Sequence, residues 1–124
     1  MKLRNIKIAM KSDKEVFDEV KETWRKVEKG EKVKKREGLY FENLEVMRKV
    51  LTEERLRILK TIRKAHPASI YELAKILKRD VKNTFDDVNF LAHIGLIDLK
   101  KTKEGREKTV PSVNYDKILL EIPV

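Results

Sequence analysis

Residues 67–99 read PASIYELAKILKRDVKNTFDDVNFLAHIGLIDL, and this stretch decides the fold. Pro67 cannot continue a helix that precedes it, because its ring removes a backbone donor and clashes with the previous turn. Ser69 followed by Glu72 forms a capping box, so a new helix is predicted over 70–77.

The connection to the next helix is very short. Only Lys78 and Arg79 separate the predicted helix from Asp80, a good N-cap for a further helix over 81–94. Gly95 follows where a left-handed C-terminal cap is needed. Two helices joined so tightly predict a helix-turn-helix.

The flanking sequence completes a larger motif. Thr52 can cap a preceding helix over 53–64, and the alternation over 96–99 predicts a strand. A polar turn containing Gly105 leads to a returning strand over 109–113. Three helices and a β-hairpin predict a winged helix-turn-helix, so the fold class is mainly α with a small β component (α+β).

The same residues resemble a known group of proteins. The stretch is similar to winged-helix regulators of the MarR/ArsR-like superfamily, and the run over 50–56 is similar to small archaeal and bacterial predicted transcriptional regulators. The resemblance implies a DNA-binding (auto)repressor acting as a homodimer, or an antitoxin-type protein with a toxin partner. It rests on Ser69, Glu72, Leu73, Ala74, Leu91, Gly95, Leu96 and Ile97.

The residues before the motif predict a separate module, so we expect an N-terminal extension over 1–51 and the winged helix-turn-helix over 52–124. Alternating apolar residues over 3–10 indicate a short edge strand. A helix is predicted from Ser12 to Gly30, then a strand over 39–41 and a short helix capped by Asn43; the tail over 115–122 is either a strand or a helix.

Composition limits the function classes. The chain has 124 residues, a formal net charge of +9 and no Cys, which favours a polyanionic partner and excludes disulfides and thiolate metal sites. No apolar run is long enough to span a membrane, and a cytoplasmic protein is expected. The excess of Lys and Glu and the absence of Gln and Cys are typical of proteins from hot environments.

No enzymatic chemistry is indicated. His66 and His93 lack companions at metal-ligand spacing, and the adjacent Asp86 and Asp87 diverge by about 100° on a helix. We therefore expect no catalytic residues, no metal site and no cofactor.

The helix over 81–94 is the expected recognition helix. One face, made of Val81, Phe85, Val88, Leu91 and Ala92, is predicted to be core.

The opposite face of that helix and the wing supply the expected contacts to double-stranded DNA. The N-terminal half of a recognition helix reaches base edges, and a basic hairpin can reach phosphates or the minor groove. Asp86 is expected to hold a nearby basic side chain, and Phe90 to pack on the wing or a partner chain. The candidate contacts are Arg79, Lys82, Asn83, Thr84, Lys100, Lys101, Lys103, Arg106 and Lys108.

A homodimer is expected because two-fold symmetry doubles a short half-site. The apolar stripe of the N-terminal helix needs a partner surface, either in the same chain or in a second copy. The alternative to a DNA reader is a protein-interaction or non-specific architectural module. The candidate dimerisation residues are Val16, Val20, Trp24, Val27, Leu39, Phe41, Ile118 and Leu120.

Overall fold

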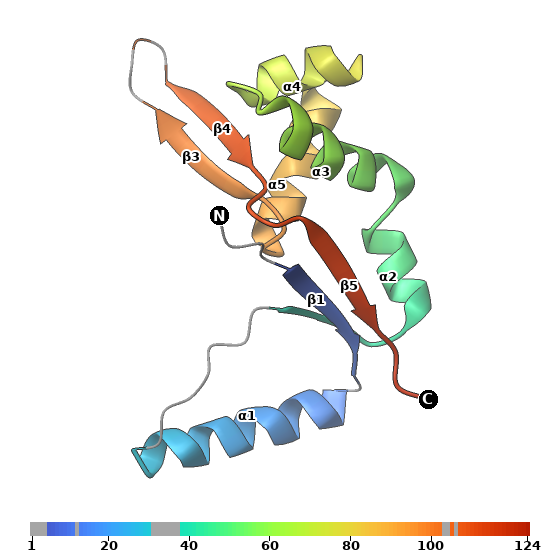
Figure 1. Ribbon diagram of the computed structural model, residues 1–124, viewed down its shortest axis with the longest axis vertical. Coiled ribbons are helices and arrows are strands. Elements are labelled where there is room, and N and C mark those ends of the chain that lie inside the picture. Colours follow the sequence, from blue (N-terminus) through green and yellow to red (C-terminus); the bar gives the residue numbers. More distant parts are fainter. Residues whose placement is uncertain (1–4, 12, 31–37, 103–104, 106) are drawn as a thin grey trace. The chain divides into compact units, whose positions relative to one another are not determined.

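The computed structural model describes residues 5–11, 13–30, 38–102, 105 and 107–124 (Figure 1). They form two compact units, one from the residues up to Val50 together with Tyr115–Val124, the other from Leu51–Asn114. The elements in chain order are β1 (Asn5–Met10), α1 (Asp13–Glu28), β2 (Gly38–Phe41), α2 (Leu44–Val50), α3 (Glu53–Ala65), α4 (Ile70–Leu77), α5 (Val81–His93), β3 (Asp98–Thr102), β4 (Lys108–Ser112) and β5 (Lys117–Glu121).

The predicted caps begin the helices of the second unit. The backbone N–H of Arg55 donates to Thr52 Oγ1 at 3.2 Å, and that of Glu72 donates to Ser69 Oγ at 3.0 Å. Asp80 Oδ2 accepts from the Asn83 N–H at 3.1 Å. Each bond satisfies one of the donors that a helix start leaves open, so these local signals place all three helices.

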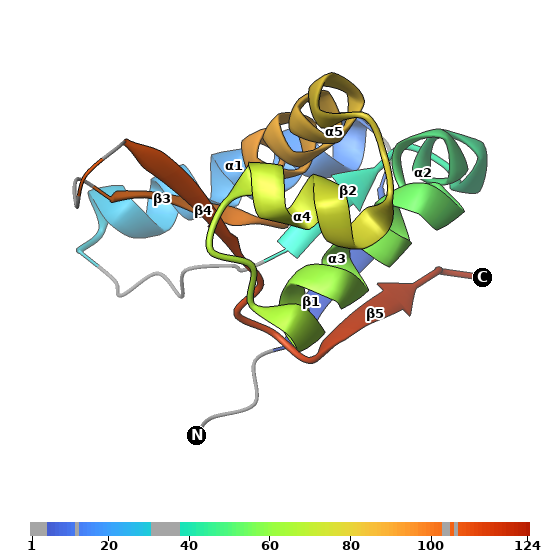
Figure 2. The same cartoon turned by 90° about the horizontal axis from the view of Figure 1, so that it is seen from above.

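The three helices enclose one apolar core, and the hairpin extends from it (Figure 2). β3 and β4 pair antiparallel, with Asp98 opposite Ser112 and Thr102 opposite Lys108. β4 begins and ends one residue earlier than predicted. β3 begins two residues and ends three residues later than predicted, and Leu96 and Ile97 are buried before the hairpin begins. This arrangement confirms the winged helix-turn-helix and the α+β class.

The buried face of α5 differs from the prediction. Val88 and Leu91 are buried as expected, but Val81 is 41% and Phe85 47% exposed. Thr84 is fully buried instead, and its hydroxyl donates to the Asp80 carbonyl at 2.8 Å. A hydroxyl that has a hydrogen-bond partner can be buried in a core. Because Thr84 is buried, the inward face of α5 is turned away from Val81 and Phe85.

The first unit contains a parallel sheet in the order β2-β1-β5. The prediction of an edge strand at the N-terminus is wrong, because β1 is the central strand and pairs on both sides, with Ile8 between Leu39 and Leu120. The tail is a strand, which settles the alternative that the sequence left open. Register partners share a face, so one face of the sheet is apolar, formed by Ile6, Ile8, Met10, Leu39, Phe41, Ile118 and Leu120.

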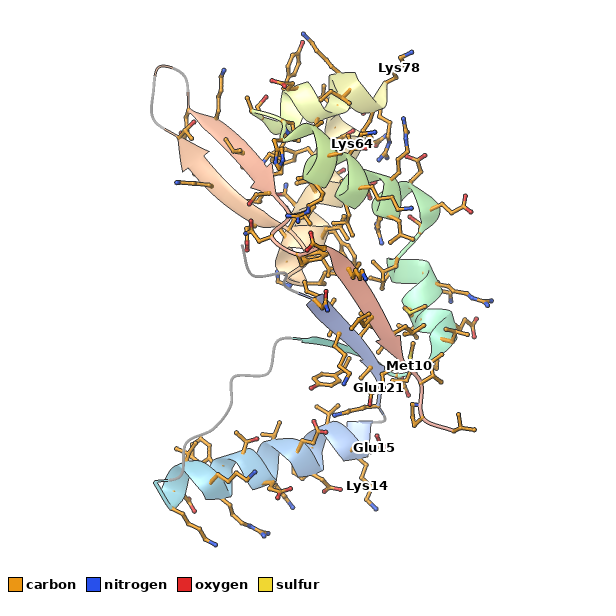
Figure 3. The ribbon with its side chains drawn as sticks, in the orientation of Figure 1. Met10, Lys14, Glu15, Lys64, Lys78 and Glu121 are labelled. Atoms are coloured by element: carbon orange, nitrogen blue, oxygen red, sulfur yellow. The ribbon has the colours of Figure 1, made fainter. Side chains whose placement is uncertain are left out.

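The other face of the sheet carries an ion pair. Lys7 Nζ lies 2.6 Å from Glu121 Oε2, and this hydrogen bond and charge hold the pKa of Glu121 below its ordinary value. Figure 3 places Glu121 near Met10, where the two paired strands end.

In the first unit, α1 ends and α2 begins as predicted, whereas Ser12, the predicted start of α1, lies outside the described residues. Gly30 has a left-handed φ of 72° just after α1, and Asn43 Oδ1 accepts from the Val46 N–H at 2.9 Å to cap α2. Lys11 links the end of β1 to α1 through an ion pair with Glu19. Within the described residues, no helix has the length and apolar character needed to cross a membrane.

The division into units differs from the expected boundaries of 1–51 and 52–124. The tail from Tyr115 belongs with the first unit, because β5 pairs with β1 along five register positions from Asn5 to Ala9. The second unit therefore consists of the three helices and the hairpin alone.

Candidate nucleic-acid interface

A partly buried ion network fixes the turn between α4 and α5. Asp87 Oδ2 accepts from Arg79 Nη2 at 3.0 Å, and Asp87 Oδ1 accepts from Arg55 Nε at 3.3 Å. Arg79 Nε also lies 3.6 Å from Glu54 Oε2. The network joins the start of α3, the turn and the middle of α5, so it holds the recognition helix in place.

Arg79 is thus committed to the protein itself. About a fifth of its side chain is exposed, and its Nη1 is buried without a hydrogen-bond partner in the part of the chain that the structure describes. Its contact with DNA stays a prediction, and the structure shows ion pairs through which it positions α5. Thr84 is removed from the predicted contacts, because its buried hydroxyl is used within α5.

Phe90 lies against the same network. Its ring centroid is 4.2 Å from the guanidinium carbon of Arg55, in a cation–π contact between α5 and α3. The expectation that Phe90 packs on the wing or on a partner chain stays a prediction, and the contact that the structure gives for Phe90 is with α3. The side of α5 that faces this network is therefore occupied by contacts within the protein.

Lys82 and Asn83 are exposed in the first turn of α5. The Asp80 cap bonds the backbone N–H of Asn83 and leaves its side-chain amide outside the helix. Asp86 is exposed one turn further along. Figure 3 labels Lys78, in the turn before α5, with its side chain extended away from the helices.

The basic residues of the wing divide between the two faces of the hairpin. Thr102 is the register partner of Lys108, and residues two apart along a strand share a face, so Lys100 and Lys108 lie on the same side. Lys101 points to the opposite side, where its Nζ lies 3.7 Å from Glu107 Oε1. Lys103 and Arg106 fall outside the described residues.

A hollow of about 510 Å³ lies between α4, the start of α5 and the wing. Val81, Phe85 and Tyr71 contribute apolar surface to it, and Tyr71 is 57% exposed. Lys75 and Lys108 are also among its lining residues. Sequence reasoning missed this surface because it assigned Val81 and Phe85 to the core.

The candidate dimerisation residues fall into two sets. In α1, Val20, Trp24 and Val27 are largely exposed, Trp24 by 67%, whereas Val16 is half-buried. The candidates in the strands all lie on the apolar face of the sheet. Leu39, Phe41 and Ile118 are half-buried there, and Leu120 is 45% exposed.

Comparisons with known proteins were made for the whole chain. None of the curated proteins matches it. A solved structure described as the transcriptional regulator homologue protein from Pyrococcus horikoshii OT3 is similar at 20% identity and a TM-score of 0.44, over 56% of this chain and 76% of that one. The family model HVO_A0114 matches residues 50–120, which is more than half of the chain. The chain therefore belongs to the HVO_A0114 family.

Proposed function

We propose that this protein is a sequence-specific regulator of transcription that binds double-stranded DNA. The observation that carries the proposal is the exposure of Lys82 and Asn83 together in the first turn of α5, a helix that Asp87 ties to the rest of its unit. In helix-turn-helix proteins that turn enters the major groove. The net charge of +9 favours the approach to a polyanion.

The two side chains have complementary chemistry for base edges. A lysine donates to guanine O6 and N7, and an asparagine makes a bidentate pair with adenine N6 and N7. Because α5 is held by ion pairs from two other segments, the backbone positions of Lys82 and Asn83 are fixed relative to the rest of the unit. Ordered donors lose less entropy on binding, which favours discrimination between sequences.

The wing supplies contacts that do not depend on sequence. Lys100 and Lys108 lie on one face of the hairpin and are exposed, so they suit backbone phosphates. Lys101 is already paired with Glu107 and contributes less. Neutralised phosphates release counterions, so binding through the wing weakens as salt rises.

The proposal includes a homodimer that represses its own gene. One winged helix covers a short half-site, and a two-fold assembly doubles it. The apolar face of α1, centred on Val20 and Trp24, is an exposed surface that a second copy would bury. The apolar face of the sheet, where Leu120 is 45% exposed, is a further candidate in the same unit. A cytoplasmic location accords with this role.

The test uses alanine variants on a duplex enriched from a randomised pool. Lys82→Ala and Asn83→Ala should each lower affinity by about 5- to 150-fold on that duplex, equivalent to about 1–3 kcal/mol, with little change on scrambled DNA. Lys60→Ala, which removes the same charge from an exposed site on α3, is the matched control and should bind as the wild type does. If both α5 variants are neutral on every duplex, base reading by α5 is refuted.

The wing is tested by the salt dependence of binding. Lys108→Ala should weaken all duplexes evenly and reduce the slope of log K against log salt by about 0.9. Lys101→Ala should change the slope less, because its charge is already opposed by Glu107. Equal affinity of the wild type for all sequences would favour an architectural module instead, and no DNA binding would favour a protein partner such as a toxin.

A further inference from the structure

The N-terminal half of α5 exposes apolar side chains beside Lys82 and Asn83. Val81 and Phe85 lie one helical turn apart on α5 and are each close to half exposed. Positions four apart on a helix differ by about 40° around its axis, so the two side chains point the same way. They form one apolar strip in the N-terminal half of the recognition helix.

The strip lies inside the hollow between α4, α5 and the wing. Tyr71 completes the apolar surface from α4, and Lys75 Nζ lies 4.7 Å from the centroid of the tyrosine ring. Lys75 and Lys108 border the hollow, as do Glu72 and Glu107. A groove lined by apolar side chains and by two lysines suits a ligand that offers apolar groups beside anionic ones, and Glu107, one of its two acidic residues, is already paired with Lys101.

Duplex DNA offers that combination in its major groove. The thymine C5-methyl is the apolar group that projects there among polar base edges, and it contacts apolar side chains such as phenylalanine. Phosphates flank the groove on both sides, and exposed lysines such as Lys75 and Lys108 carry the charge suited to contact them. Glu107 is paired with Lys101, which limits its repulsion of those phosphates.

We propose that Val81 and Phe85 recognise thymine methyl groups and that the preferred sites of this protein therefore contain thymines at fixed positions. The proposal rests on the proposed function and makes it more specific, because it assigns a base to apolar residues beside Lys82 and Asn83. Lys82 and Asn83 donate to purine edges, whereas the strip distinguishes thymine from cytosine and uracil by one methyl group.

The test replaces thymine by uracil, which removes only the methyl group. A duplex enriched from a randomised pool by the full-length protein is prepared with each thymine changed in turn to uracil. At one or more positions the affinity should fall about fourfold per methyl, equivalent to about 0.8 kcal/mol for one buried carbon. At the remaining thymines the affinity should not change.

Variants connect the effect to the strip. Phe85→Ala should bind the thymine duplex more weakly and should no longer distinguish it from the uracil duplex. Val81→Ser, which removes both side-chain methyl groups without adding bulk, gives a second test and should also weaken the preference for thymine. Ile76→Ala is the matched control, because Ile76 is exposed to a similar extent on α4 but does not line the hollow; it should keep the full preference for thymine.

The outcomes separate the two proposals. Specific binding that is unaffected by uracil at every position would overturn the methyl recognition and leave DNA reading in place. A preference for thymine that survives unchanged in both Phe85→Ala and Val81→Ser would also overturn it. Failure of the wild type to enrich any duplex would overturn the proposed function itself.

Discussion

Removal of the Asp87 carboxylate should destabilise the second unit more than any single surface change. Asp87 accepts from Arg79 at 3.0 Å and from Arg55 at 3.3 Å, and each of the three side chains is only about one-fifth exposed. Asp87→Ala leaves two guanidinium groups without this carboxylate, and Arg79 Nη1 is already buried without a partner among the described residues.

The magnitude follows from the degree of burial. Breaking a fully buried ion pair costs about 3–5 kcal/mol, whereas an exposed pair contributes about 0–1 kcal/mol. At one-fifth exposure, with two arginines affected, we expect Asp87→Ala to lower the free energy of unfolding by about 2–3 kcal/mol. Asp87→Asn keeps the shape and one acceptor and should lose less.

The assay is denaturant unfolding of the full chain at fixed pH and salt, with the slope compared between variants. The matched control is Asp86→Ala, which removes the same charge at the adjacent, exposed position and should stay within about 0.5 kcal/mol of the wild type. Replacing Arg79 by Met in the Asp87→Ala background should recover part of the loss, because it removes a charge that is no longer balanced. Equal stability of Asp87→Ala and Asp86→Ala would refute this explanation of how α5 is held.

Three further perturbations test other parts of the fold. Gly38→Ala should lower the free energy of unfolding by about 1–3 kcal/mol, because a Cβ there would lie 2.9 Å from the carbonyl oxygen of Lys7; unchanged denaturant unfolding would contradict this. Ser69→Ala should lose about 1 kcal/mol in the same assay and Ser69→Asp should restore it, since Ser69 caps α4. Glu121 should titrate below 4.5 by NMR and return towards that value in Lys7→Met. Because the folded-state pKa of Glu121 is lowered, the ion pair stabilises the fold above about pH 4.5, and this contribution is lost as the pH falls through the folded-state value. A titration midpoint that Lys7→Met leaves unchanged would exclude Lys7 as the cause.

The winged helix-turn-helix could be predicted because local capping residues mark where its helices begin and end. Thr52, Ser69 and Asp80 each bond a backbone N–H two or three residues into a helix, and Gly95 adopts a φ of 90° after α5. Such caps depend on neighbouring residues alone, so they can be recognised without knowledge of the tertiary structure.

The candidate site was harder to predict because it depends on which side of α5 faces inward. A count of apolar positions placed Val81 and Phe85 in the core and Thr84 outside. Burial of Thr84 is favourable because its hydroxyl donates to the Asp80 carbonyl. Ion pairs with Glu54 of α3 and Asp87 of α5 hold the Arg79 side chain against the protein. These are tertiary contacts, which sequence periodicity does not describe.

The sheet of the first unit shows the same limit. Charged residues between the apolar ones in β1 indicated an edge strand, yet β1 lies between β2 and β5. One partner, β2, follows α1 and the other, β5, lies near the C-terminus, and parallel pairing over such separations leaves no turn signal in the sequence.

The most direct test of the account is a binding titration of the full-length protein across a salt series. One duplex carries the DNA upstream of its own gene, and the other has the same composition in scrambled order. The account predicts a preference of about a thousandfold or more for the upstream duplex, with affinity for both falling as salt rises. Equal affinity for the two duplexes at every salt concentration, or no binding to either, would contradict it.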